Sequence, residues 1–406
     1  MSPDTDTLVS PADGSSVVPG SARTAPTRDR HAPEPSGPAS TDPAPTGPGA
    51  SAAPSRPPLA WVAWVRLVAI LGVISIHNAG ANATAARAGD HRPAHLLGVA
   101  LDLPFSVAVP VFVMVSGALT LDPASFRGTG HYLRKRVLRT VPAIVVWHLA
   151  YVAFLQLWWY PEPLTTRDVV QRILTGRLAP HLYFLWIVLG LSLMAPVLIR
   201  WLAQAGRREQ VLTGAALAAI PVLSSATRSW RATQAVAVET PWTWWVCYLG
   251  LFVLGWALRD VVLRGVALLV AGLLAVGLPT LVSWQYADPG LAPRLDQLLP
   301  VSYYGGSVVG GAVCAFLVAR STIRPGGALA LLARPGVVRW VNPLAVASLG
   351  IYACHVMVMW TLMKLGILGA PVLSGPDLVL RLLLIVVIST ALTLAARRVP
   401  VVRRVF

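Results

Sequence analysis

The stretch that decides the fold is WVRLVAILGVISIHNAG, residues 64–80. This apolar segment has the character of a membrane-spanning helix, and it carries Arg66 near its start and His77 near its end. These residues are eleven positions apart, so a helix places them within about 20° of the same face and separates them by roughly 16 Å along its axis. Ionisable side chains inside hydrocarbon are costly, which makes both residues candidates for a functional site. The alternative is that Arg66 anchors the helix at the interface and His77 is a packed histidine.

The composition indicates a polytopic, all-α membrane protein. Hydrophobic residues make up 55% of the 406-residue chain and charged residues only 12%, against about 25% charged residues in soluble domains. A spanning segment must satisfy its own backbone hydrogen bonds, which helices do. The net charge of +16 does not indicate nucleic-acid binding, because the basic residues lie in short loops between apolar runs and at the chain ends. We expect the lipid bilayer, with its anionic headgroups, to be the partner of this charge.

The three cysteines, Cys247, Cys314 and Cys354, all lie inside apolar runs. Their positions give neither a disulfide framework nor the spacing of a metal site. We therefore expect small buried thiols and no metal.

Apolar runs of spanning length follow one another along the chain, about ten in all. The loops on the side that holds both chain ends contain more basic residues, so the positive-inside rule places both termini in the cytoplasm. With this orientation Arg66 lies toward the cytoplasm and His77 lies in the outer half of the bilayer. The expected helices lie near residues 61–79, 96–119, 137–158, 181–200, 210–226, 242–258, 265–284, 301–319, 343–364 and 378–396.

The two ends of the chain differ from the apolar part between them. Residues 1–57 are dominated by Pro, Ala, Ser, Thr, Gly and Asp, and such a segment buries too little apolar surface to offset its ordering entropy. It also lacks the basic and apolar regions of a signal peptide. We predict a disordered cytoplasmic tail at 1–57, a transmembrane domain at 58–396 and a basic cytoplasmic tail at 397–406.

A second basic cluster, HYLRKRVLRTVPAIVVW at residues 131–147, opens the third expected helix. Arg136 and Arg139 are three positions apart, so they share one helix face. Two guanidinium groups on one face can bind phosphate oxygens in a forked geometry. The alternative is the ordinary topology signal of a cytoplasmic helix end, although Arg139 already lies within the apolar run.

Three further segments complete a pattern: VPVFVMVSGALTL at 109–121, HLYFLWIVLGLSLMAPVL at 181–198 and SLGIYACHVMVMW at 348–360. In the second of the expected helices, Ser116 and Gly117 favour close packing against a neighbour. Together with the Arg66–His77 and Arg136–Arg139 pairs, and in this order, the segments make the chain resemble the acyltransferase 3 family of integral-membrane acyltransferases. The resemblance runs from about residue 60 to residue 396. The short form, with no soluble domain after the helices, is similar to the surface-polysaccharide O-acetyltransferases.

This resemblance implies an enzyme of the plasma membrane that transfers an acyl group, most simply acetyl, from acyl-coenzyme A to a hydroxyl. The implied acceptor is a cell-envelope carbohydrate or a glycolipid. His77 and Arg66 are then the catalytic residues, and Arg136 and Arg139 hold the coenzyme A phosphates. Arg66 either binds a phosphate or steers the pantetheine arm. Histidine has an ordinary pKa near neutrality, and His77 acts either as a general base or as a covalent acyl carrier.

Several alternatives stay open at this point. No carboxylate, Asp102 included, has a spacing that marks it as the partner of His77, so none is assigned. The remaining candidates, Tyr352 with His355, His148 and His181, are interpreted as structural hydrogen-bonding residues. Two rival functions remain: a transporter or flippase, and a non-catalytic protein that binds an envelope lipid. The identity of the acceptor and the oligomeric state are left open.

Overall fold

The computed structural model describes residues 59–85, 92–160, 164–231, 240–288, 290, 293–400 and 402–405. Every regular element within these ranges is helical, as the composition predicts for a polytopic all-α protein. The tail predicted at 1–57 lies outside the described residues. Of the basic tail predicted at 397–406, the structure describes residues 397–400 and 402–405, which include a short 3-10 turn, Val402–Arg404.

Each of the ten predicted runs contains a helix. Among the described residues, seven helices are long and apolar enough to cross a membrane, and α12 with α13 adds an eighth span that is bent by 55°. The two other runs form shorter apolar helices, Trp244–Leu258 and Gly306–Thr322. The longer elements are α1 Ala60–Thr84, α2 Arg92–Asp102, α3 Ala108–Thr120, α4 Thr129–Phe154, α5 Thr166–Leu174, α6 Tyr183–Leu202, α7 Arg207–Arg231, α8 Leu249–Leu258, α9 Gly265–Ala287, α10 Pro293–Leu298, α11 Gly306–Thr322, α12 Pro335–Val346, α13 Ser348–Lys364 and α14 Gly375–Ala396.

Two of the predicted boundaries are wrong. α4 begins at Thr129, eight residues before the expected start at 137, so the whole basic cluster from His131 to Arg139 lies on the helix. The single helix expected at 343–364 is instead the end of α12 followed by α13, with the break at Ala347. Pro343 lies one turn before this break, but a proline perturbs the helix on its N-terminal side, and Ala347 N still donates to Pro343 O at 3.0 Å, so the missing N–H of Pro343 does not account for the bend.

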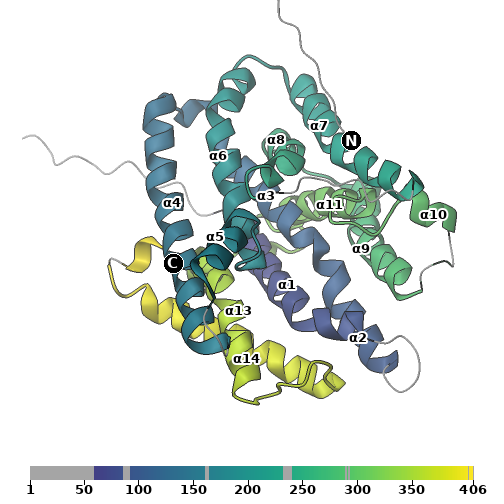
Figure 1. The fold of residues 1–406 in the computed structure, drawn as a ribbon. Helices are drawn as coiled ribbons and strands as arrows, with labels where there is room; N and C mark the ends of the chain where they lie inside the picture. The colour runs from purple at the N-terminus through teal and green to yellow at the C-terminus, as the bar shows by residue number, and fades with distance from the viewer. Residues whose placement is uncertain are drawn as a thin grey trace, which may run out of the picture. The chain divides into compact units, whose positions relative to one another are not determined.

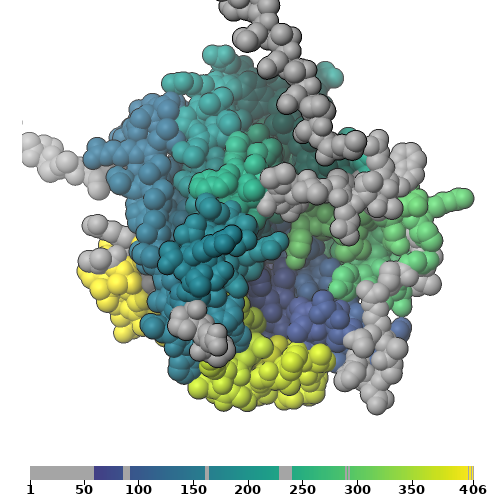
Figure 2. Space-filling model, in the orientation of Figure 1, coloured from purple at the N-terminus to yellow at the C-terminus, as the bar shows by residue number. Residues whose placement is uncertain are grey.

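Helix α1 lies within the bundle, in contact with six other helices. It contacts α2, α3, α11, α12, α13 and α14. In Figure 1 it lies inside the bundle, between α2 and α13. Helix α14 also contacts α2, and in Figure 2 the yellow-green α14 lies next to the blue-purple α2 on the face shown. Because α1 is surrounded by other helices, its polar side chains can face protein instead of lipid.

Close backbone contact joins α3 to α8. A Cβ added to Gly117 of α3 would overlap the backbone carbonyl of Phe252, and one added to Gly255 of α8 would overlap that of Met114. The close packing expected at Gly117 is therefore confirmed. Each glycine permits an approach that any other residue would prevent, so α3 and α8 form a fixed pair beside α1.

Candidate active site

Helix α1 carries both predicted catalytic residues in one unbroken segment, Ala60–Thr84. Helical geometry therefore keeps Arg66 and His77 roughly 16 Å apart along the axis. Both side chains are half-buried. They lie in different surroundings, an open cavity at the Arg66 end and a cluster of histidines at the His77 end.

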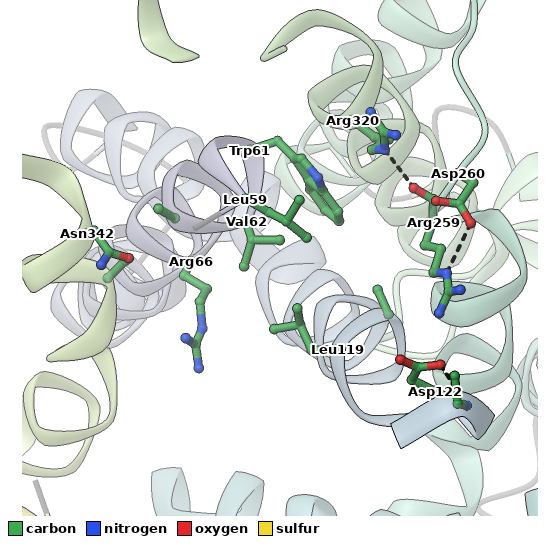
Figure 3. Close-up of a pocket in the computed structure, with 14 residues that line it drawn as sticks. Leu59, Trp61, Val62, Arg66, Leu119, Asp122, Arg259, Asp260, Arg320 and Asn342 are labelled. Atoms are coloured by element: carbon green, nitrogen blue, oxygen red, sulfur yellow. Dashed lines mark hydrogen bonds and ion pairs between the residues drawn. The ribbon is translucent and has the colours of Figure 1, made fainter. Parts of the chain in front are cut away.

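The Arg66 end opens into a cavity of about 630 Å³ where five helix ends meet. Figure 3 shows the Arg66 side chain extending from α1 between Asn342 of α12 and Leu119 of α3. His77 does not line this cavity. The lining residues are Leu59, Trp61, Val62, Ala63, Arg66, Ala118, Leu119, Asp122, Ala124, Arg259, Asp260, Arg320, Asn342 and Ala345. The cavity thus lies on the side of the bundle that the charge pattern assigns to the cytoplasm, and that assignment stays a prediction.

Of the second predicted pair, Arg136 and Arg139, only Arg139 is found close to Arg66. Arg139 is exposed on α4 and lies close enough to Arg66 for the two positive charges to repel each other. Arg136 lies with its guanidinium 5.3 Å from the centre of the Tyr132 ring, a cation–π contact within its own helix. Arg66 has neither a hydrogen-bond partner nor a carboxylate partner among the described residues. Arg66 and Arg139 repel each other, so an anion bound between them would lower the electrostatic energy of this site.

Two further arginines contribute to the cavity, and sequence reasoning had assigned them only to topology. Arg259 lies over the ring of Trp256, with its guanidinium carbon 3.2 Å from the ring centre, and its Nε donates to the Asp260 carboxylate at 3.0 Å. Arg320 donates its Nε to the Arg259 carbonyl at 2.6 Å, as Figure 3 shows. The wall opposite Arg66 therefore carries two cations, Arg259 and Arg320, and two carboxylates, Asp122 and Asp260. The contacts of Arg259 and Arg320 hold both guanidinium groups in place.

At the other end of α1, two histidines from distant parts of the chain meet His77. The centre of the His77 ring lies 5.2 Å from that of His355 on α13 and 5.8 Å from that of His181, which lies in the 3-10 turn before α6. The His181 and His355 rings are themselves 5.3 Å apart. His181 is 2% exposed and His355 1%, whereas His77 keeps accessible surface. The fold thus builds a cluster of three imidazoles with only His77 accessible.

Several polar atoms of this cluster lack partners. The Nε2 atoms of His181 and His355 and the hydroxyl of Tyr352 are buried with no hydrogen bond to any described residue. Buried polar groups are nearly always hydrogen-bonded, so orphaned groups require an explanation such as a ligand or a catalytic role. Tyr352 lies with its ring centre 5.9 Å from that of His181 and 6.1 Å from that of His355. The orphaned atoms therefore belong to one small region beside His77.

Among the described residues, His77 has no carboxylate partner and is not part of a group of side chains arranged to bind a metal. Asp102 lies beside Gly80, with its Oδ2 3.8 Å from where a Cβ on that glycine would stand. The ion pairs found in the described ranges, Arg92–Asp288 and Arg259–Asp260, lie elsewhere. Within the same ranges no three His, Cys, Asp or Glu side chains are arranged to hold a metal ion.

A buried arginine fixes the residue that follows His77. Arg381 of α14 is 2% exposed and donates its Nε to Asn78 Oδ1 at 2.8 Å and its Nη2 to the Asn78 carbonyl at 2.9 Å. Its Nη1 donates to the carbonyls of Leu368 and Ala370, and Asn78 Nδ2 donates to Leu378 O at 3.0 Å. These bonds tie α1 to α14 at the level of His77 and set the rotation of α1 about its axis.

Sequence reasoning therefore located both ends of the site but missed most of their surroundings. The segments HLYFLW and SLGIYACH pointed to the positions of His181 and His355, but nothing in the sequence placed them beside His77. Arg381 was not singled out, although a charged residue inside an apolar run is a general signal of function.

Comparison with known proteins gives one result that covers most of the chain. A family model described as an acyltransferase domain, Acyl_transf_3, matches residues 59–398. The chain matches no curated protein and no solved structure. The matched range contains the cavity, the histidine cluster and the Arg381 network.

Proposed function

This chain belongs to the acyltransferase 3 family, and on that premise we propose that it moves an acetyl group from acetyl-coenzyme A to a hydroxyl group. The proposed acceptor is a carbohydrate or glycolipid of the cell envelope, and the proposed location is the plasma membrane. The family match and the apolar helices make the protein a multi-pass membrane acyltransferase. They favour this activity over a transporter, a flippase or a non-catalytic lipid-binding protein.

One observation carries the proposal: a single helix joins a cationic cavity to a histidine cluster. Arg66 lines the cavity, and His77 lies roughly 16 Å farther along α1 among imidazoles. Acetyl-coenzyme A has phosphates at one end and, at the other end of a long pantetheine arm, the thioester that carries the acetyl group. A ligand of that form suits a site whose cations and whose base are separated along one helix.

The donor end of the proposal rests on charge. Coenzyme A carries several phosphate groups, and Arg66 with Arg139 offers two close cations that lack a carboxylate among the described residues. Arginine binds phosphate through two parallel N–H donors, which lysine cannot do. We assign phosphate binding to Arg66, Arg136 and Arg139, with Arg136 acting next to Tyr132. Arg259 and Arg320 line the same cavity, where Asp122 and Asp260 also lie.

The chemical end rests on His77. An alcohol is a weak nucleophile until a base takes its proton, and histidine is the usual base near neutral pH. His77 keeps accessible surface and stands beside two buried imidazoles, so it is the member of the cluster that a substrate reaches. The alternative mechanism, in which His77 first accepts the acetyl group and then passes it on, uses the same position.

The test is ester-linked acetate on envelope material. Inside-out membrane vesicles from cells with and without the protein are incubated with radiolabelled acetyl-coenzyme A, and alkali-labile label on carbohydrate and lipid is measured. We expect label only with the protein, and a loss of about 100-fold or more in His77→Ala at equal membrane levels, which is the usual contribution of a general base. No acetyl ester with the wild-type protein, or an active His77→Ala variant, contradicts the proposal.

The same vesicles separate the two roles of His77. After a rapid acid-free quench, mass spectrometry of the peptide containing His77 detects an acetyl group only if this residue is a covalent carrier. We expect an unmodified peptide under conditions of steady turnover, because a general base forms no bond to the acyl carbon. An acetylated His77 assigns the carrier mechanism instead.

A further inference from the structure

We propose that His355 is the positioning residue of His77, taking the place that a carboxylate holds in a serine-hydrolase triad. In this arrangement His355 accepts a hydrogen bond from one nitrogen of His77, while the other nitrogen receives the proton of the acceptor hydroxyl. The inference rests on the proposed function, since it describes how the base of that reaction is held.

The hydrogen bond of His355 to the backbone fixes its tautomer. His355 Nδ1 lies 2.6 Å from the carbonyl oxygen of Tyr352. A carbonyl oxygen can only accept, so Nδ1 carries the hydrogen and donates it. In a neutral imidazole the other nitrogen, Nε2, is then an acceptor with a free lone pair. The local geometry of α13 therefore presents a defined acceptor and not an adaptable one.

This acceptor is buried and makes no hydrogen bond in the described residues. His355 is 1% exposed, and its Nε2 has no partner among the residues that the structure describes. The centre of its ring lies 5.2 Å from that of His77. An N–H···N bond of about 3 Å, with about 1 Å from each nitrogen to its ring centre, spans such a distance. The structure does not show this bond, since His355 Nε2 has no partner in the described residues. The two rings are close enough for it to form when either ring rotates about its side-chain bonds.

Alternative partners are less suitable. The described residues contain no carboxylate that pairs with His77, and Asp102 stands beside Gly80. His181 also has an unpartnered Nε2, but its ring centre lies farther from that of His77, at 5.8 Å, and its ring packs 4.9 Å from that of Tyr151. His355 is therefore the first choice, and His181 is included in the test.

The proton and the bonds balance in this scheme. As the acceptor oxygen forms its bond to the thioester carbonyl carbon, its proton passes to His77, which becomes an imidazolium that donates to His355 Nε2. The C–S bond then breaks, and His77 returns the same proton to the departing thiolate of coenzyme A. His355 keeps its own Nδ1 hydrogen throughout and forms no bond to the substrate.

Two amide substitutions separate this role from simple packing. In His355→Asn the amide reaches the position of Nδ1, so the bond to Tyr352 can be kept while the acceptor at Nε2 is lost. In His355→Gln the amide reaches the position of Nε2, so the acceptor is kept while the bond to Tyr352 is lost. Rates are measured in the vesicle assay with radiolabelled acetyl-coenzyme A, at equal membrane levels of each variant.

We expect kcat to fall about 100-fold in His355→Asn and about tenfold or less in His355→Gln, with KM for acetyl-coenzyme A nearly unchanged in both, since one step of acid–base catalysis is at stake. A purely structural role predicts the opposite order, because Asn keeps the helix contact. Equal losses, or a better Asn variant, overturn the proposal. A Gln–Asn difference at His181 but not at His355 overturns it as well and moves the role to His181.

The controls keep this test separate from the test of the proposed function. His148 bonds its own helix through Ile144 and contacts Trp186. It is near His181 but has no ring contact with His77 or His355 in the described residues, so His148→Gln should keep kcat within about twofold of wild type. If the wild-type protein forms no acetyl ester, the proposed function fails before His355 is in question. If wild type and His148→Gln are active, the outcome depends on His355 and His181 alone.

Discussion

The two ends of α1 differ in how they hold polar groups. At the Arg66 end, cations line a cavity, and several of them are held by neighbours such as Trp256 and Asp260. At the His77 end, imidazoles and a tyrosine hydroxyl are buried with orphaned atoms, and a guanidinium is sealed from solvent by carbonyl oxygens. Charge beside an open cavity costs little, whereas each polar group of the second kind opposes folding.

The two ends of α1 should therefore respond differently to substitution. Residues at the cavity should change mainly the affinity for an anionic donor, because solvent and neighbouring arginines can substitute for one lost contact. Residues at the histidine end should change kcat or stability, because nothing nearby replaces a lost partner. Substitutions at the two ends should therefore separate donor affinity from kcat and stability.

The strongest test lies at Arg381. Arg381→Met leaves Asn78 and two loop carbonyls without their buried donor, so we expect a loss of about 3 kcal/mol of stability and a fall in kcat of about 30-fold. Arg381→Lys keeps the positive charge but loses the several N–H donors of the guanidinium, so its stability and kcat should lie between those of Arg381→Met and wild type. Unfolding in a mixed detergent titration and the vesicle assay give the two quantities. A stable and fully active Arg381→Met variant would show that the network does not hold His77.

The cavity end is tested by a cycle of two arginines. Arg66→Gln and Arg139→Gln should each raise KM for acetyl-coenzyme A about tenfold, which corresponds to one lost charge-assisted contact of about 1.4 kcal/mol. Because both charges act on one anion, we expect the double variant to show a smaller loss than the sum of the two. A large drop in kcat with unchanged KM would contradict the contrast between the two ends.

A packing control lies between these regions. Gly255→Ala places a methyl group against the backbone of Met114, so α3 and α8 must separate, and we expect about 2 kcal/mol of lost stability. Gly272→Ala is the matched substitution, since a Cβ there has open space around it. Thermal unfolding of both variants in lipid nanodiscs provides the comparison. Equal midpoints for the two would contradict the close contact of α3 with α8.

The smallest effect is expected at the far wall of the cavity. Arg259→Gln removes one cation that is already paired with Asp260, so KM for acetyl-coenzyme A should rise only about threefold. Raised salt should reduce this difference further, because exposed charges are screened. A tenfold or larger rise in KM would instead make Arg259 equal to Arg66 in donor binding.

Much of the fold was predictable because hydrophobic length and helical periodicity are local properties. The spacing of Arg66 and His77 had only one geometric meaning once the segment was helical. The bend between α12 and α13 was missed because the run of apolar residues continues through Ala347, and Pro343 alone did not show where the helix breaks. The early start of α4 was missed because the expected start at 137 followed the beginning of the apolar run, whereas the helix also includes the basic residues before it.

The surroundings of His77 could not be predicted in the same way. His181 and His355 are far from His77 in sequence, and their meeting depends on how α6 and α13 pack around α1. No periodic pattern within one helix contains that information. Arg381 was accessible to sequence reasoning in principle, since a guanidinium within the apolar run of α14 must find several acceptors.

The reciprocal glycines of α3 and α8 have a mechanical consequence. At Gly117 and Gly255 the backbones of the two helices touch directly, with no flexible side chain between them. The two helices therefore resist sliding past each other and should move as one unit. Asn342 and Ala345 line the same cavity from α12, which joins α13 through a 55° bend. If a bulky ligand widens the cavity, we therefore expect α12 to move and α3 with α8 to stay in place.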